Sequence, residues 1–129
     1  MAAFRRWRRV DARVSDHEVD SDTHVIELAG EFDLYTAPEF KARLAEVIAE
    51  GKCRVVVDLS EVTFLDSTML GVLVGGVKRL GPGGGSLELI GARKENVMKM
   101  FETTGLDRVF RIHGAREEAL AEGAEANGV

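Results

Sequence analysis

A short apolar segment near the middle of the chain, residues 55–59 (Val-Val-Val-Asp-Leu), restricts the fold more than any other feature. It is too short for a core helix and rich in β-branched residues, which favours a strand. A strand that is apolar on both sides needs cover on both faces, as in the centre of a parallel sheet. We therefore expect residues 55–59 to form the middle of a largely parallel sheet.

Strand-like and helix-like periods alternate around this segment. A weak strand at residues 10–14 and a hairpin turn at 15–22 are expected first, and Thr36-Ala37-Pro38-Glu39 is expected to form a capping box that opens a helix. This order predicts an α/β fold, a single domain with a mixed, largely parallel sheet of about five strands and helices packed on it. The other expected elements are strands at 25–29, 87–90 and 109–112, and helices at 36–50, 67–80 and 94–103.

The chain has the size of one ordinary domain. Its 129 residues, 45% of them apolar and 30% charged, can bury a single core. We divide it into a basic segment with the weak first strand (1–22), the α/β domain (23–113) and a C-terminal helix or tail (114–129).

Charge and hydropathy exclude several classes of partner. The net charge of −5 argues against nucleic acid, because phosphate binding needs a basic face. The basic cluster at residues 5–9 is interpreted as a solvated tail. No apolar run approaches the ~20 residues that span a bilayer, and no signal-peptide core follows the basic start. We expect a cytoplasmic protein, a monomer or weak dimer without membrane contact, whose single Cys53 forms no internal disulfide.

Two predicted loops follow strands of the parallel part of the sheet, at residues 30–35 and 63–68. Functional groups gather beyond the carboxyl ends of parallel strands, where loops lead into helix N-termini. Asp33 and the pair Asp66-Ser67 should therefore face the same edge. Asp66 or Ser67 is expected to cap the helix at 67–80, because either side chain can accept from the first-turn N–H groups.

The same helix carries an unusual outward face. Leu70, Leu73, Val74 and Val77 recur at helical spacing and are assigned to the core. An outward face normally carries Lys, Glu or Arg, whereas small or uncharged residues here let another backbone approach. We interpret this face as a docking surface with the Ser67 hydroxyl at its rim; it comprises Thr68, Gly71, Val72 and Gly75, followed by Arg79.

These segments resemble the STAS family (sulphate transporter and anti-sigma factor antagonist), and within it the stand-alone bacterial antagonists. The most specific match is the apolar strand that runs into an Asp-Ser-Thr turn and an apolar helix, at residues 55–68. The likeness extends over about residues 23–112 and includes Gly-Glu-Phe-Asp at 30–33, Leu-Gly-Val-Leu at 70–73 and Phe-Glu-Thr-Thr-Gly-Leu at 101–106.

The resemblance implies a regulatory cycle. Ser67 takes the place of the phosphoacceptor, and Asp33 that of the acidic residue that helps to engage a kinase. The implied partner is an anti-sigma factor that is also an ATP-dependent serine kinase. The unmodified antagonist captures this kinase and releases the sigma factor, phosphorylation ends the capture, and a metal-dependent serine phosphatase restores it. The chain is then a substrate without a cofactor or metal of its own, and not an enzyme.

Met69 departs from the family pattern, which commonly has Gly there. On a helical projection Met69 falls beside Gly76, at the border of the docking face. We expect it either to lengthen the contact patch or to crowd it.

Four other interpretations are open. Ser67 could be a nucleophile with His24 or His113 as its base, although glycines do not surround it as in a hydrolase elbow. The Gly-rich run at residues 81–85 could bind a nucleotide phosphate, but it leads into a strand instead of a helix. Asp33, Asp58 and Asp66 could hold a cation. The chain could also be the STAS module of a lipid-transport complex or a stress-sensing scaffold.

Overall fold

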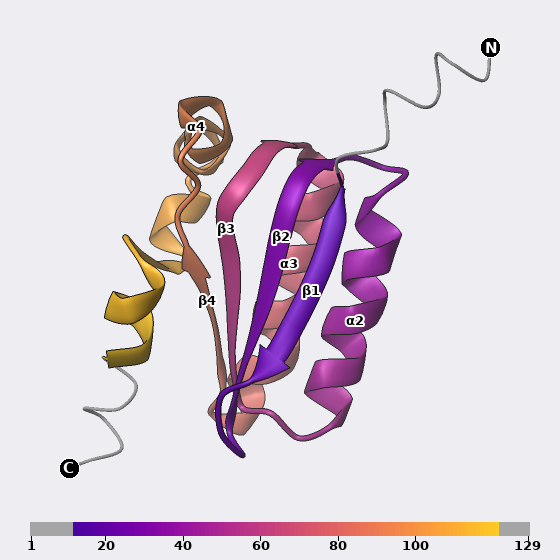
Figure 1. The fold of residues 1–129 in the computed structure, drawn as a ribbon, viewed down its shortest axis with the longest axis vertical. Helices are drawn as coiled ribbons and strands as arrows, with labels where there is room; N and C mark the ends of the chain where they lie inside the picture. Colours follow the sequence, from indigo (N-terminus) through magenta and orange to yellow (C-terminus); the bar gives the residue numbers. More distant parts are fainter. Residues whose placement is uncertain (1–11, 122–129) are drawn as a thin grey trace.

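Five strands form one sheet in the order β1-β2-β3-β4-β5 (Figure 1). The computed structural model describes residues 12–121. β1 pairs antiparallel with β2, and all other pairs are parallel. The predicted mixed, largely parallel sheet is confirmed. The strands are β1 (Arg13–Glu18), β2 (Thr23–Phe32), β3 (Arg54–Leu65), β4 (Ser86–Ile90) and β5 (Arg111–His113).

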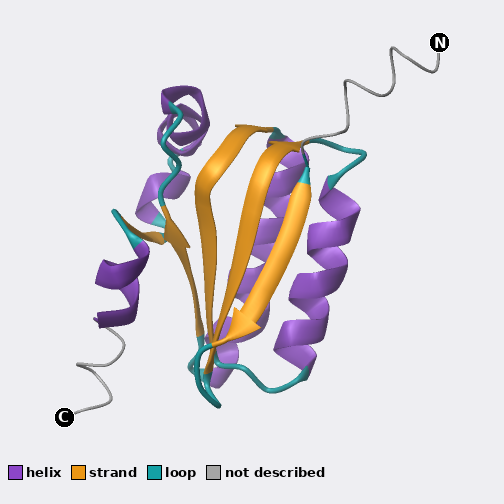
Figure 2. Cartoon of the chain, in the orientation of Figure 1, coloured by secondary structure: helices purple, strands orange, loops and turns teal. Residues whose placement is uncertain are grey.

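Helices cover the sheet unequally (Figure 2). α2 (Ala37–Ala49), α3 (Ser67–Leu80) and α4 (Glu95–Thr104) bury side chains in one large core. The short turns η1 (Gly81–Gly83) and η2 (Leu106–Arg108) follow α3 and α4. A last helix at residues 116–121 packs on a second, smaller cluster. None of the described helices is long and apolar enough to cross a membrane.

β3 is buried on both faces of the sheet, by the main core on one face and by the smaller cluster on the other. Val55 and Val57 face the main core, and Val56 faces the smaller cluster with Ala119 of the last helix. All three valines are fully buried, which confirms the expectation for residues 55–59. β3 continues to Leu65, beyond the predicted end of the strand, and so carries the chain to the edge where its next loop begins.

Charged contacts hold the last helix on the sheet. The Arg116 guanidinium contacts the carboxylates of Glu27 and, at 2.8 Å, of Asp58. Arg54 Nη2 donates to the Ala119 carbonyl oxygen at 2.7 Å. The sequence predicted only a lightly held helix here. It did not reveal these contacts, because the partners lie on strands that are distant in the sequence.

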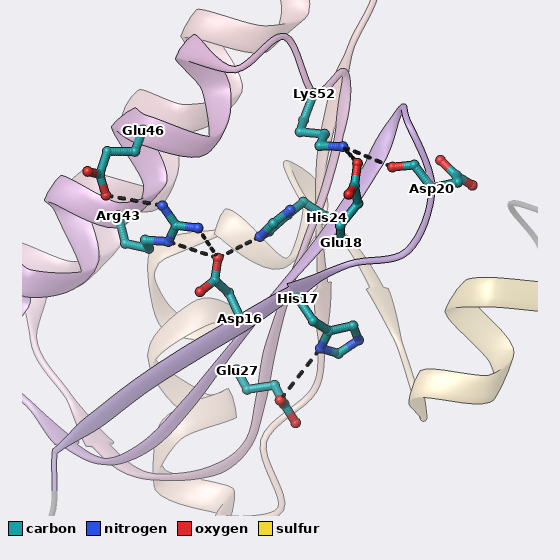
Figure 3. A network of polar contacts seen from close by, with 9 residues as sticks. All are labelled: Asp16, His17, Glu18, Asp20, His24, Glu27, Arg43, Glu46 and Lys52. Carbon is teal, nitrogen blue, oxygen red and sulfur yellow. Dashed lines mark hydrogen bonds and ion pairs between the residues drawn. The ribbon is translucent and has the colours of Figure 1, made fainter.

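The hairpin at the start of the domain exists but is displaced. β1 spans Arg13–Glu18 and its turn spans residues 19–22, whereas the sequence predicted a strand at 10–14 and a turn from residue 15. The polar residues that suggested a turn are bonded across the fold (Figure 3). Asp16 accepts from Arg43 Nε at 2.8 Å and contacts His24 Nε2 at 2.5 Å, while Glu18 contacts the Lys52 ammonium.

Glu88 is the centre of a second buried polar group. It pairs through both oxygens with Arg54, contacts His113 Nε2 at 2.8 Å and accepts from Ser86 Oγ at 2.9 Å. Burial alone would raise the pKa of Glu88, but these hydrogen bonds outweigh it and lower the pKa to about 2. The carboxylate therefore stabilises the fold in its charged form.

We predict that this contribution disappears in acid. The folded-state pKa lies below the ordinary value of 4.5, so the contribution is complete above that value and falls as the pH drops towards 2. Glu88→Gln should be less stable than the natural chain at neutral pH, and the difference should close in acid. Urea unfolding across this range would measure it, and a difference independent of pH would contradict the assignment.

The glycine run after α3 is a tight turn. Gly84 adopts a φ of 83°, and Gly85 lies so close to the preceding strand that a Cβ there would stand 2.5 Å from the Cys53 carbonyl oxygen. The run then enters β4 directly. Gly84 and Gly85 are thus explained by the backbone conformation and packing of the turn.

We expect Gly85→Ala to destabilise the domain by about 1–3 kcal/mol, because backbone atoms on both sides must move. Gly83→Ala is the matched control, since a Cβ at Gly83 meets nothing within 4 Å. It should change the free energy of unfolding by less than about 0.5 kcal/mol. Equal losses for the two variants in urea unfolding would show that the close approach is unimportant.

Candidate functional site

The loops after β2 and β3 lie side by side at one edge of the sheet. Phe32 and Leu65 are partners at the ends of these strands, and the Asp66 N–H donates to the Phe32 carbonyl oxygen at 3.2 Å. Asp33 and Ser67 each come one residue after this contact. The prediction that Asp33 and Asp66-Ser67 share an edge is confirmed.

Asp33 shapes the first loop. Its Oδ1 accepts from the backbone N–H groups of Tyr35 at 2.9 Å and Thr36 at 3.1 Å. The Thr36 hydroxyl accepts from the Asp33 N–H and donates to the Glu31 carbonyl oxygen. The predicted capping box is therefore wrong, because the hydroxyl that was to cap α2 is used within the loop.

Asp66 begins α3. Its carboxylate accepts from the backbone N–H groups of Thr68 at 3.0 Å and Met69 at 3.4 Å, which makes Asp66 the N-cap. Ser67 is the first helical residue and is exposed. Its hydroxyl forms no hydrogen bond with any residue of 12–121.

The inward face of α3 is rotated from the predicted one. Val74 and Val77 are only partly buried, whereas Met69 is fully buried. The prediction that Met69 contributes to the docking surface is therefore wrong, since its side chain lies in the core. A Cβ on Gly76 would stand 2.5 Å from Leu87 Cδ1, so the glycine lets this face approach β4. The buried residues are Met69, Leu70, Leu73, Gly76 and Leu80.

A groove of about 760 Å³ lies between α2 and α3. Thr68, Gly71, Val72 and Gly75 line its α3 side, so the structure places these four predicted docking residues on one surface. A Cβ on Gly71 or Gly75 would meet nothing within 4 Å, which shows that the missing side chains create the space. Along α2 and the loop before it, the groove is lined by Leu34, Ala37, Pro38, Lys41, Ala42, Leu44 and Ala45.

Exposed apolar side chains surround the Ser67 edge and were not predicted from the sequence. Leu34 is 60% exposed, Tyr35 65% and Phe64 44%. All three belong to the two loops or to the end of β3. The sequence carried one signal for Phe64. Phe64 and Leu65 are adjacent in a strand, so their side chains point to opposite faces of the sheet. Leu65 is buried, and the Phe64 ring is left exposed.

The rival interpretations find less support at this site. His24 contacts Asp16 and His113 contacts Glu88, while the Ser67 hydroxyl has no imidazole partner among residues 12–121. Asp58 binds Arg116 and the Ser60 N–H. Over the same residues, no group of three or more His, Cys, Asp or Glu side chains could hold a metal ion.

Comparisons with known proteins agree on one family. A family model described as "Mlab, STAS domain" matches residues 16–114. The chain is similar to the anti-sigma-B factor antagonist of Listeria monocytogenes, with 38% identity over 101 residues, 78% of this chain and 88% of that one. It is also similar to the crystal structure of an anti-sigma factor antagonist from Mycobacterium paratuberculosis, with 29% identity, a TM-score of 0.78 and coverage of 86% and 92%.

The fold is also that of SpoIIAA, a Bacillus cell fate determinant and anti-sigma factor antagonist. Its unphosphorylated and phosphorylated structures are 21% and 23% identical to this chain, and each has a TM-score of 0.69. The alignments cover 88% and 85% of this chain and 98% of each SpoIIAA chain.

The N-cap assignment gives a stability prediction. Asp66→Ala should lower the free energy of unfolding by about 1 kcal/mol, because two first-turn N–H groups lose their acceptor. Asp66→Asn keeps an oxygen in the same place and should lose only a fraction of that. Thermal unfolding of both variants would test this, and an equal loss would show that charge, and not capping geometry, is what matters.

Proposed function

We propose, from the premise that the chain belongs to the STAS-domain family of anti-sigma factor antagonists, that its unmodified form binds an anti-sigma factor kinase and that phosphorylation of Ser67 ends this binding. The observation that carries the proposal is the exposed Ser67 hydroxyl at the start of α3, next to a groove whose α3 wall lacks charge for two turns. A modification there changes the contact surface directly.

The charges at this edge explain how a phosphate would act. It would add about −1.5 to −2 charges and three acceptor oxygens. Asp66 already occupies the N–H groups of Thr68 and Met69, so the phosphate would face a carboxylate instead of free donors. We therefore expect the phosphate to project into solvent, where a bound partner would have to desolvate it.

The fold itself should tolerate the modification. Ser67 is exposed and its hydroxyl bonds to no described residue, so phosphorylation breaks no contact. The switch would then act by blocking a surface, with little change of conformation.

The partner surface would combine the edge and the groove. Asp33 presents the first loop to the kinase, Asp66 holds Ser67 in place, and Thr68, Gly71, Val72 and Gly75 offer close approach to α3. In the proposed cycle the captured kinase releases its sigma factor in the cytoplasm. The kinase later transfers phosphate from ATP to Ser67, and a metal-dependent serine phosphatase removes it.

Two substitutions separate binding from switching. Ser67→Ala should bind the recombinant kinase at least as tightly as the natural chain but accept no phosphate, whereas Ser67→Asp should bind at least about tenfold more weakly. Both should keep the melting temperature within about 2 °C. Isothermal titration calorimetry and transfer of labelled phosphate from ATP would measure these effects.

Ser15→Asp adds the same charge on the exposed edge strand β1 and serves as the control. It should bind the kinase normally. Equal affinities for Ser67→Ala and Ser67→Asp would rule out the switch. Labelling at Thr68 or Ser60 instead of Ser67 would assign the phosphate to another residue.

A further inference from the structure

The groove between α2 and α3 has a charge of one sign. Among the described residues that line it, only Lys41 on α2 and Arg79 on α3 are charged, and both are cationic and exposed. The chain as a whole carries a net charge of −5. The groove is therefore a basic, apolar strip on an acidic protein.

These two cations are available to a ligand. Neither Lys41 nor Arg79 forms an ion pair within residues 12–121. The neighbouring Arg43, by contrast, is bound to Asp16 at 2.6 Å and to Glu46 at 3.2 Å. Between the two free cations the walls are small or apolar, with two glycines that expose the α3 backbone.

The dimensions suit a helix. From Thr68 to Arg79, α3 advances eleven residues, or about 16 Å, which is about three turns. Helices that pack through small residues approach at the short end of the usual 8–10 Å between axes. An α-helix with an apolar stripe would bury that stripe along the groove and leave its flanks beside Lys41 and Arg79.

We infer that this groove receives an amphipathic helix of the kinase whose apolar face is flanked by Asp or Glu side chains. The inference rests on the proposed function, because it names the part of the partner that the same surface recognises. Charge complementarity with Lys41 and Arg79 specifies the acidic flanks. The mode is that of a helix seated in a groove, with anchors at helical spacing.

This partner chemistry also gives the phosphate a second effect. The groove begins at Thr68, the residue after Ser67. A dianion on Ser67 would stand at the end of a strip that holds an acidic helix, and would repel it through space as well as burden the contact with desolvation. Recognition and switching would thus use opposite charges at neighbouring positions.

The test fills the groove and reverses its charge separately. Gly75→Leu places a side chain where a Cβ meets nothing, so the fold should remain while the affinity for the recombinant kinase falls at least about tenfold. Lys41→Glu/Arg79→Glu should weaken binding about tenfold at low salt and flatten its dependence on ionic strength. Lys94→Glu/Lys99→Glu changes the net charge by the same amount at exposed positions outside the groove, so it is the matched control and should bind almost normally.

The outcomes separate this inference from the proposed function. If the natural chain neither binds the kinase nor is phosphorylated at Ser67, the proposed function fails. If it does both, and the groove variants bind and are phosphorylated like the control, only the helix-in-groove inference fails.

A photo-crosslinking residue at position 42, which also lines the groove and is exposed, identifies the occupant and keeps Lys41 in place. Cross-links to an acidic, amphipathic helix of the kinase would support the inference. Cross-links to a loop or a basic segment of the kinase would overturn it. So would cross-links to a second copy of this chain, with self-association in sedimentation equilibrium that Gly75→Leu abolishes.

Discussion

The parallel pairing of β2 with β3 is the constraint on which the site depends. It brings the ends of both strands to one edge, so that two loops more than thirty residues apart in the chain meet at the contact between Phe32 and Asp66. Burial of β3 on both faces fixes this pairing, because a slip of one residue would exchange its apolar residues between the two layers. The position of Ser67 thus follows from core packing some distance away.

The surface formed by the loops of Asp33 and Asp66 and the groove between α2 and α3 depend on different features of the chain. The loop surface depends on hydrogen bonds within the chain, such as those of Asp33 and Asp66, and would be sensitive to loss of a single oxygen. The groove depends on absent side chains, since Gly71 and Gly75 leave it open. Each glycine costs α3 up to about 1 kcal/mol in helix propensity, which is a stability cost set against access to the backbone.

Local patterns in the sequence predicted the parts that depend on neighbours in the chain. The valines of β3 were predicted from their β-branching, and their burial is confirmed. The sequence predicted a cap at Asp66 or Ser67, and the structure assigns it to Asp66. Asp16 was misplaced because it bonds to Arg43, which is distant in the sequence. Thr36 does stand at the N-cap position of α2 as predicted, but its hydroxyl bonds back into the preceding loop and caps no N–H group of the helix. Met69 was misplaced because the rotation of α3 is set by the contact of Gly76 with β4, which lies outside any helical projection.

The single cysteine lies at the other end of the same strand. Cys53 is exposed and immediately precedes β3, whereas Ser67 follows two residues after its end. Twelve extended residues correspond to about 35–40 Å, so the two side chains stand at opposite edges of the sheet. A fluorescent dye attached to this thiol would report the slower tumbling of a captured complex from a place remote from the phosphate.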